Sequence, residues 1–170
     1  QKEVPSYLLD SEILLSNTLR KSREELLINL DLEISQNSYL KFKEYLLRRS
    51  KKEPIAYILE EKEFWSKNFN INQSTLIPRP ETELLVNKLL KIFKEKKISI
   101  LDIGTGSGCI ILSLIGELKR SNGVGIDISK EAILVAKKNA LKHKLFNRVK
   151  FFNRSLNCVF NKKFDLIVSN

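Results

Sequence analysis

Leu101-Asp102-Ile103-Gly104-Thr105-Gly106-Ser107-Gly108-Cys109 is the stretch that decides the fold. It joins two apolar segments, residues 98–103 and 109–118, and so predicts a strand, a glycine loop and a helix in succession. In an open α/β sheet, the loop after the first strand is where nucleotide-like ligands bind, and glycines let the backbone approach them closely. The spacing here is G-x-G-x-G. It differs from the G-x-G-x-x-G of dinucleotide sites and argues against a pyrophosphate ligand.

The chain beyond this loop continues to alternate between predicted strands and helices. The predicted strands cover residues 98–103, 123–128, 149–152 and 164–169, and the predicted helices cover residues 109–118 and 130–141. Such alternation is typical of a doubly wound parallel sheet with right-handed crossovers. A further helix is predicted from Pro80 to about Lys96, because proline in the first turn and nearby acidic residues mark a helix N-terminus.

The first third of the chain has a different pattern. Between Leu8 and Lys52 apolar residues recur at helical spacing and predict three helices. Ser22 and Glu25 have the spacing of a capping box for the second helix, and Asn37-Ser38 predicts the start of the third. We interpret the basic run at residues 48–52 as a solvated helix end and not as a nucleic-acid patch.

Two short strands are predicted after the helices, at residues 55–59 and 64–71, with a charged turn at residues 60–63 between them. This β-hairpin separates the helical part of the chain from the alternating part. We therefore expect three parts: a helical domain for substrate recognition at residues 1–53, a β-hairpin linker at 54–77, and the first portion of an α/β domain at 78–170.

The composition excludes several classes of protein. The 170 residues are 42% hydrophobic, which is ordinary for a globular protein. No apolar run is long enough to cross a bilayer and no secretion signal begins the sequence, so we expect a cytoplasmic location without membrane association. Cys109 and Cys158 have no partner at metal-ligand spacing, so no metal is expected. The net charge of +10 permits a nucleic-acid partner without requiring one, because the lysines are scattered.

Asp127 is the second marker of a ligand site, because it ends the predicted strand about 20 residues after the glycine loop. A carboxylate at the tip of the second strand can accept hydrogen bonds from both hydroxyls of a ribose, and its charge strengthens those bonds. This feature fits either kind of adenosine cofactor, a dinucleotide or S-adenosylmethionine. The structural alternative is that Asp127 only caps the following helix.

Four motifs, in order and in spacing, resemble the bacterial peptide-chain release-factor glutamine methyltransferase family. They are Ile77–Glu83 with the sequence Ile-Pro-Arg-Pro-Glu-Thr-Glu, the loop Leu101–Cys109, Gly125–Asp127, and Phe164–Asn170. The resemblance extends from about Tyr7 to the last residue. It implies a Rossmann-like class I methyltransferase sheet, preceded by a small helical domain and a β-hairpin linker, with S-adenosylmethionine as the cofactor.

The resemblance also implies site residues. Asn170 matches the asparagine of the family's Asn-Pro-Pro-Tyr motif, and its side-chain oxygen would accept a hydrogen bond from the substrate amide, which makes it the catalytic residue. The residues expected to bind substrate are Asn170, Arg79, Glu81 and Thr82. Those expected to bind the cofactor are Asp102, Gly104, Thr105, Gly106, Ser107, Gly108, Asp127, Ile128, Ser155, Leu156 and Asn170.

The sequence departs from the family pattern at two places. The family has glycines in the hairpin where this chain has Glu60 and Ser66, so the turn geometry needs explanation. Near the adenine site the family has an acidic residue beside a hydrophobic one, whereas this chain has Ser155-Leu156-Asn157. Here Leu156 packing and a hydrogen bond from Ser155 or Asn157 are the expected substitutes.

The function expected from the resemblance is transfer of a methyl group from S-adenosylmethionine to a glutamine side-chain amide in a peptide-chain release factor, by a monomer. One alternative is a methyltransferase acting on nucleic-acid exocyclic amines or on another protein, since Asn-Pro-Pro-Tyr serves those as well. Another is an inactive fragment, because the sequence stops inside the catalytic motif, and we expect little turnover by residues 1–170 alone. An oxidoreductase is disfavoured by the glycine spacing.

Overall fold

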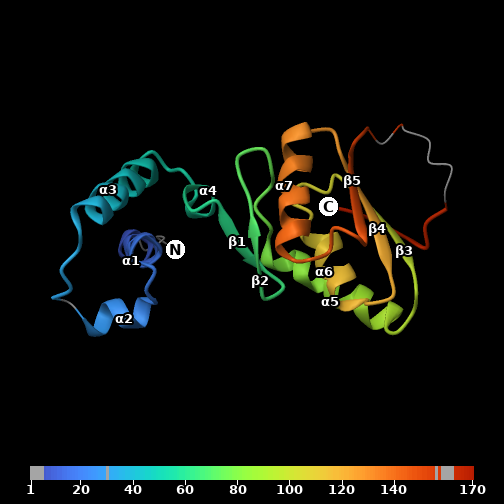
Figure 1. Ribbon diagram of the computed structural model, residues 1–170, viewed down its shortest axis with the longest axis horizontal. Helices are drawn as coiled ribbons and strands as arrows, with labels where there is room; N and C mark the ends of the chain where they lie inside the picture. Colours follow the sequence, from blue (N-terminus) through green and yellow to red (C-terminus); the bar gives the residue numbers. More distant parts are fainter. Residues whose placement is uncertain (1–5, 30, 156, 158–162) are drawn as a thin grey trace, which may run out of the picture. The chain divides into compact units, whose positions relative to one another are not determined.

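The computed structural model describes residues 6–29, 31–155, 157 and 163–170 (Figure 1). The chain divides into two compact units, Gln1–Leu59 and Glu60–Asn170, which are described separately below. The predicted domain limits at 53/54 and 77/78 stay predictions. Within the described residues, no helix is both long enough and apolar enough to cross a membrane.

The first unit is helical, as predicted. Its helices are α1 (Tyr7–Leu19), α2 (Arg23–Ile28), α3 (Gln36–Ser50) and the short α4 (Ile55–Ile58). The predicted capping box of α2 is confirmed: Ser22 Oγ accepts from the Glu25 amide at 3.1 Å, and Glu25 Oε2 accepts from the Ser22 amide at 2.7 Å. Helix α3 begins slightly earlier than predicted, because Ser35 is its N-cap and accepts from the Ser38 amide.

The basic end of α3 is not simply solvated, and this interpretation was wrong for two arginines. Arg49 pairs with Asp10 of α1 at 2.7 Å, and Asp10 is only 9% exposed. Arg48 pairs with Glu53 at 2.6 Å and also donates to the backbone carbonyls of Tyr57 and Ile58. These arginines hold α1, α3 and α4 together, so their role within this unit is structural.

The first predicted strand of the hairpin was also wrong. Residues 55–58 form α4, whose last carbonyls are satisfied by Arg48, and the supposed charged turn is itself a strand. The hairpin of the second unit pairs β1 (Glu61–Phe64) with β2 (Lys67–Asn70) in antiparallel register. Trp65 and Ser66 form its turn with φ values of 53° and 51°. Two successive positive φ values are what a two-residue hairpin turn requires, and glycine is the usual residue there.

The predicted parallel sheet is confirmed. Its strands are β3 (Ser99–Ile103), β4 (Asn122–Asp127), β5 (Val149–Asn153) and β6 (Leu166–Ser169), in the spatial order β5-β4-β3-β6. The associated helices are α5 (Pro80–Phe93), α6 (Cys109–Glu117) and α7 (Lys130–Lys142). Helices α6 and α7 connect strands in one direction across the sheet and lie on the same side of it (Figure 1).

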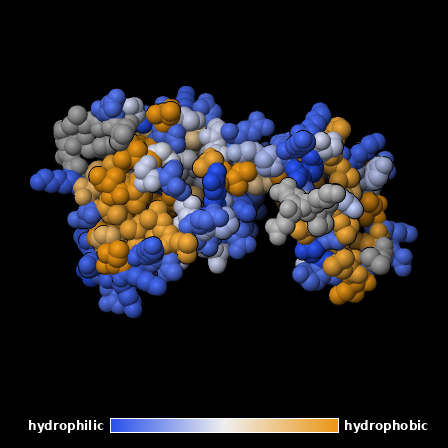
Figure 2. Space-filling view, turned by 180° about the vertical axis from the view of Figure 1, so that it is seen from behind, coloured by the Kyte–Doolittle hydropathy of each residue, from blue (hydrophilic) through white to orange (hydrophobic). Residues whose placement is uncertain are grey.

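The core of the second unit lies between the sheet and these helices. Helix α6 is buried along almost its whole length, and Phe64 and Phe69 of the hairpin join the same core with exposures of 1% and 0%. Apolar side chains also gather on the surface of this unit (Figure 2), where Phe152 and Ile167 are among the exposed hydrophobic residues. Because Phe64 and Phe69 lie in this core, the hairpin packs as part of the α/β unit.

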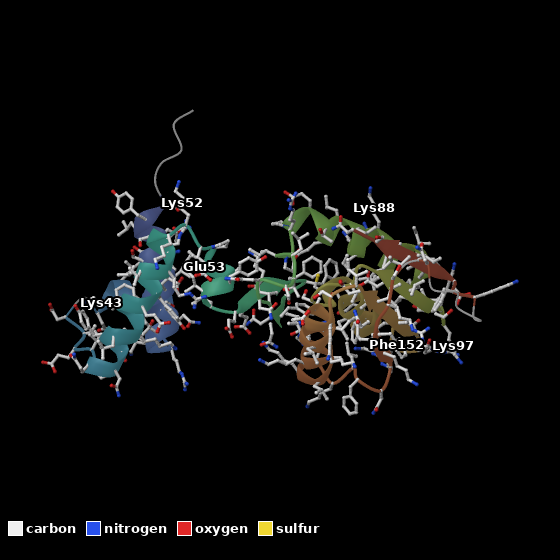
Figure 3. All side chains as sticks on the ribbon, turned by 90° about the horizontal axis from the view of Figure 1, so that it is seen from above. Lys43, Lys52, Glu53, Lys88, Lys97 and Phe152 are labelled. Carbon is white, nitrogen blue, oxygen red and sulfur yellow. The ribbon has the colours of Figure 1, made fainter. Side chains whose placement is uncertain are left out.

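Exposed lysines occur on several elements of both units. Lys43 lies on α3, Lys88 on α5 and Lys97 just before β3, and all three are exposed (Figure 3). This distribution agrees with the scattered lysines of the sequence. It gives no separate argument for a nucleic-acid partner.

Candidate active site

The glycine loop leaves β3 in a conformation that three glycines make possible. Gly104, Gly106 and Gly108 have φ values of +69°, +54° and +79°. A Cβ atom added at Gly104 would meet no atom within 4 Å, and one at Gly106 would only touch the Gly104 carbonyl at 4.0 Å. The first two glycines therefore border open space, in which a ligand can approach the backbone.

Asp102 lies behind this loop and braces it. Its side chain is 1% exposed and accepts a hydrogen bond from the Thr105 hydroxyl at 2.7 Å. The Thr105 amide in turn donates to the Ile126 carbonyl of β4 at 2.9 Å. Burial raises the pKa of Asp102 to about 7, although the Thr105 bond acts in the opposite direction. The structure thus gives Asp102 a supporting position, and its contact with a cofactor stays a prediction.

Asp127 ends β4 beside the loop, and both of its oxygens already have backbone partners. Oδ2 accepts from the Gly106 amide at 2.9 Å, and Oδ1 accepts from the Ser129 amide at 2.9 Å. Ser129, not Asp127, is the N-cap of α7. A carboxylate oxygen can accept two hydrogen bonds, so the half-buried Asp127 keeps capacity for ribose hydroxyls. Ile128 beside it is 81% exposed.

A buried amide that sequence reasoning missed holds the other side of the loop. Asn139 of α7 is fully buried, and its Nδ2 donates to the carbonyls of Ser107 at 2.8 Å and Asn70 at 2.9 Å. Its Oδ1 accepts from the Asn70 amide and from Asn70 Nδ2 at 2.7 and 2.9 Å. One side chain therefore connects the hairpin, α7 and the glycine loop. The available signal was a polar residue on the apolar face of the helix, next to Ala136 and Ala140.

The loop and two of the other motifs meet at one cavity of about 270 Å³. Its lining comes from the segment before α5, from the glycine loop with the start of α6, and from Asn170 after β6. The lining residues are Leu76, Ile77, Pro78, Arg79, Thr82, Gly104, Thr105, Gly106, Ser107, Cys109, Ile110 and Asn170. Residues from three separate parts of the sequence, which were predicted to contact cofactor or substrate, are thus brought together here.

Within this cavity, Asn170 and Thr82 are bonded to each other. Asn170 Nδ2 donates to Thr82 Oγ1 at 2.9 Å. The Ser107 hydroxyl also lies at the cavity and is buried, with no hydrogen-bond partner among the described residues. Glu81 is exposed and does not line the cavity, so its predicted contact with substrate has no support from this geometry.

The predicted adenine contacts are described only in part. Ser155 and Asn157 are exposed, and the Asn157 amide donates to Ser155 Oγ at 3.2 Å. Leu156 lies outside the described residues. Asn153, at the end of β5, donates to the carbonyls of Asp127 and Ile128 and so ties the tips of β4 and β5 together. This contact was not predicted from the sequence.

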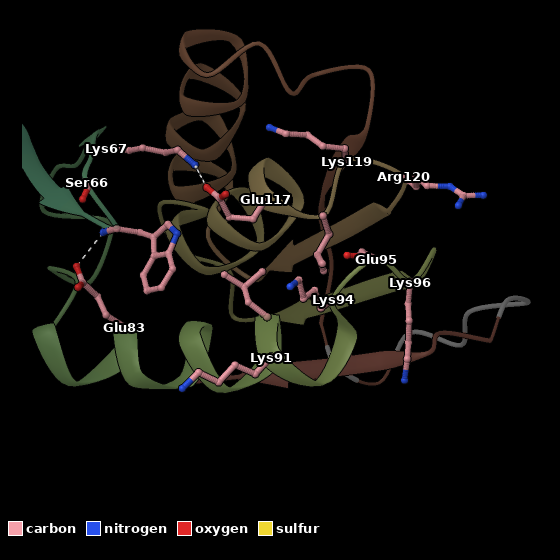
Figure 4. A pocket seen from close by; sticks show the side chains of 13 residues that line it. Ser66, Lys67, Glu83, Lys91, Lys94, Glu95, Lys96, Glu117, Lys119 and Arg120 are labelled. Atoms are coloured by element: carbon pink, nitrogen blue, oxygen red, sulfur yellow. Dashed lines mark hydrogen bonds and ion pairs between the residues drawn. The ribbon is translucent and has the colours of Figure 1, made fainter.

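A larger cavity, of about 1120 Å³, contains none of the predicted site residues (Figure 4). It is lined by the hairpin turn, by α5 and by the residues that precede β3 and β4, so it lies toward the amino edge of the sheet. Lys67 and Glu117 are paired at 3.1 Å on its wall, and Glu83 accepts from the Trp65 amide. Ligands of parallel sheets bind at the carboxyl edge, so the smaller cavity is the candidate active site.

Comparison with known proteins identifies the two parts of the chain. Residues 1–59 match the family model described as PrmC N-terminal domain, and residues 94–170 match the one described as Methyltransferase domain. No cluster of three metal-binding side chains occurs in the part of the chain that the structure describes. The sheet topology and the domain match therefore define a class I methyltransferase fold with a Rossmann-like sheet, as the sequence predicted.

Similarity to individual proteins narrows the family. A release factor glutamine methyltransferase of Buchnera aphidicola subsp. Schizaphis graminum is 45% identical over 99% of this chain and 60% of its own length. One from Leptospira interrogans is 42% identical over 100% of this chain and 61% of its own. A bifunctional methyltransferase of Rickettsia conorii is 36% identical over 98% of this chain and 37% of its own.

The chain is similar to release factor glutamine methyltransferases along nearly its whole length, and its first part matches the PrmC N-terminal domain. The chain spans about three fifths of the length of the Buchnera and Leptospira proteins and 37% of the Rickettsia protein. The predicted resemblance is therefore confirmed.

Proposed function

We propose that this chain is part of an enzyme that transfers a methyl group from S-adenosylmethionine to the side-chain amide nitrogen of a glutamine in a peptide-chain release factor. The observation that carries the proposal is the shared cavity, where the glycine loop meets Thr82 and Asn170. A methyl donor and an amide acceptor must lie within one site for the transfer to occur. Relatives named for this activity match nearly the whole chain.

The residues present fit the proposed cofactor. Open space beside Gly104 and Gly106 leaves room for its methionine portion, and the Ser107 hydroxyl is a buried polar group at the cavity. Asp127 retains acceptor capacity for two ribose hydroxyls. When bound, the cofactor supplies a methyl group that is already activated by its sulfonium.

The protein's contribution is then to position a weak nucleophile. An amide nitrogen is planar, and its lone pair is delocalised into the carbonyl. An acceptor such as Asn170 Oδ1 can fix one amide N–H and so turn the nitrogen toward the donor. Positioning of this kind can supply much of the rate enhancement without a general base. We propose that the enzyme acts as a cytoplasmic monomer on the release factor.

The second candidate is a methyltransferase with another acceptor, such as the exocyclic amine of a nucleic acid. The similarity to a protein of Rickettsia conorii that is named bifunctional methyltransferase favours this second candidate, because the name implies two activities. Exocyclic amines and glutamine amides both present an NH₂ group on a planar carbon. The two candidates therefore differ in acceptor and not in cofactor.

The experiment that tests the proposal has a binding arm and a transfer arm, both with the protein expressed at its full natural length. In the binding arm, isothermal titration compares S-adenosylhomocysteine with NAD, in the wild type and in Asp127→Ala. Lys150→Ala on the exposed side of β5 is the matched control. We expect S-adenosylhomocysteine to bind the wild type and the control, and Asp127→Ala to lose at least 10-fold in affinity, because a charge-assisted bond to ribose is removed.

In the transfer arm, labelled methyl groups from S-adenosylmethionine are followed into a release factor, into the same factor with its acceptor glutamine changed to alanine, and into RNA and DNA. Label in the wild-type factor alone supports the proposal. Label in nucleic acid would favour the second candidate. Binding of NAD in place of S-adenosylhomocysteine would contradict both.

A further inference from the structure

The hydrogen bond between Asn170 and Thr82 joins two elements whose positions are fixed independently. Thr82 lies in the first turn of α5, where its amide donates to the Arg79 carbonyl at 3.0 Å, and it is 8% exposed. Asn170 directly follows β6, where Ser169 pairs with Ile103 and its hydroxyl donates to the Ile103 carbonyl. The Thr82 hydroxyl therefore meets the Asn170 side chain at a defined place.

The direction of this bond matters because an amide side chain ends in two different groups, a nitrogen and an oxygen. Its nitrogen only donates hydrogen bonds and its oxygen only accepts them. When Nδ2 donates to Thr82 Oγ1, Oδ1 lies on the side of the planar amide group that faces away from Thr82. The reversed orientation would place Oδ1 against Thr82 and present an NH₂ group in its place.

A substrate amide NH₂ can be held only by an acceptor. An asparagine that presented its own NH₂ would set two donors against each other and leave the substrate nitrogen unfixed. The orientation of the Asn170 amide therefore decides whether this residue can bind the acceptor substrate. In the structure, the bond from Asn170 Nδ2 to the Thr82 hydroxyl holds the productive orientation.

We propose that Thr82 is a positioning residue, which acts on the substrate through Asn170. Thr82 Oγ1 accepts from Asn170 Nδ2 and thereby directs Asn170 Oδ1 toward the NH₂ group to be methylated. This inference rests on the proposed function. It also changes the expectation for Thr82, which was predicted to contact the substrate directly.

Two substitutions separate the hydroxyl from the rest of the side chain. Thr82→Val keeps the shape and removes the hydrogen-bond acceptor, whereas Thr82→Ser keeps the acceptor and removes only a methyl group. In the protein at its full natural length, we expect Thr82→Val to lower kcat for methylation of the release factor by about 10-fold, the effect of losing one hydrogen bond in the transition state. KM for S-adenosylmethionine and affinity for S-adenosylhomocysteine should stay within about 2-fold, and Thr82→Ser should recover most of kcat.

A second measurement follows the bond itself and does not depend on activity. In ¹⁵N-labelled protein, the side-chain NH₂ signals of Asn170 are assigned by their loss in Asn170→Ala. We expect one of the two protons to be shifted by its bond to Thr82, to lose that shift in Thr82→Val, and to keep it in Thr82→Ser.

The outcomes distinguish this inference from the proposed function. An active wild type with unchanged kcat in Thr82→Val, or with equal losses in the valine and serine variants, overturns the inference and leaves the proposed function intact. A wild type that does not methylate release factor overturns the proposed function. In that case unchanged Asn170 signals in Thr82→Val also overturn the orienting bond, and a shift lost in valine alone supports it.

Discussion

Asn139 offers the sharpest test of how the candidate site is held. It is fully buried, and its side chain makes four hydrogen bonds of 2.7 to 2.9 Å to Asn70 and Ser107. Asn139→Ala removes all four and leaves three backbone groups and the Asn70 side-chain NH₂ without this partner. Each buried polar group without a partner costs about 1–3 kcal/mol, and water that enters the site recovers part of this cost. We therefore expect the free energy of unfolding to fall by roughly 3–5 kcal/mol.

Asn139→Asp is the more demanding variant because it preserves size. It keeps one accepting oxygen but sets the other against the carbonyls of Asn70 and Ser107, which the amide nitrogen now contacts at 2.9 and 2.8 Å. We expect a loss of stability at least as large as that of Asn139→Ala at neutral pH. The loss should be smaller at acidic pH, where a protonated carboxyl can donate one hydrogen bond.

The assay is urea unfolding followed by tryptophan fluorescence. Trp65 is the chain's single tryptophan and lies in the second unit, so its signal reports on the unit that contains Asn139. The matched control is Lys138→Ala, the exposed neighbour on α7, which should stay within about 0.5 kcal/mol of the wild type. A loss below about 1 kcal/mol in Asn139→Ala, or a fully tolerated Asn139→Asp, would refute this account of the hydrogen bonds.

Three further predictions concern single residues of the second unit. The raised pKa of Asp102, about 7 against 3.8, means that the folded chain keeps a proton that the unfolded chain has lost. The stability that this proton contributes is fully present below pH 4 and is lost as the pH rises toward 7. Between pH 5 and pH 8, the free energy of unfolding measured in urea should therefore fall by roughly 2–3 kcal/mol more in the wild type than in Asp102→Asn. Ser66→Gly should raise the thermal midpoint and increase the free energy of unfolding by about 1 kcal/mol, because φ is 51° at this position. Asn68→Gly in the adjacent strand is the control and should lower the midpoint. Equal effects of the two substitutions would exclude relief of backbone strain at Ser66. Gly125→Ala should cost about 1–3 kcal/mol in urea unfolding, because a Cβ would lie 2.6 Å from the Phe151 ring, and an unchanged midpoint would mean that the ring gives way.

The sequence predicted the α/β unit well because its signals are local and repeated. Each strand contains a short apolar run, and the helices begin at a proline (α5), a glycine (α6) or a serine cap (α7). The positions of the glycine loop and Asp127 at one edge of the sheet were predictable for the same reason.

The errors lie where distant contacts override local preference. Residues 55–58 are apolar enough for a strand, but Arg48 donates to the carbonyls of Tyr57 and Ile58 and stabilises a helical turn. The charged segment Glu61–Phe64 forms a strand because Phe64 packs into the core, while Glu61 pairs with Lys142 of α7. Neither partner can be identified from the hairpin sequence alone.

The candidate site was predictable in its motifs but not in its supports. Arg79, Thr82 and Asn170 were each singled out from sequence, yet the bond between Thr82 and Asn170 depends on the placement of α5 against β6. The position of Asn139 beside Ser107 likewise depends on how α7 packs on the hairpin. These contacts join residues 32 to 88 positions apart, so no local pattern predicts them.

The three anchors of the glycine loop have a consequence for the evolution of ligand preference. Thr105 is held by Asp102, Gly106 by Asp127, and the Ser107 carbonyl by Asn139. A loop already fixed in this way loses little conformational entropy when a ligand binds, so little binding free energy is needed to order it. New substrates can therefore be acquired by changing the rim of the cavity, while the loop itself tolerates few substitutions.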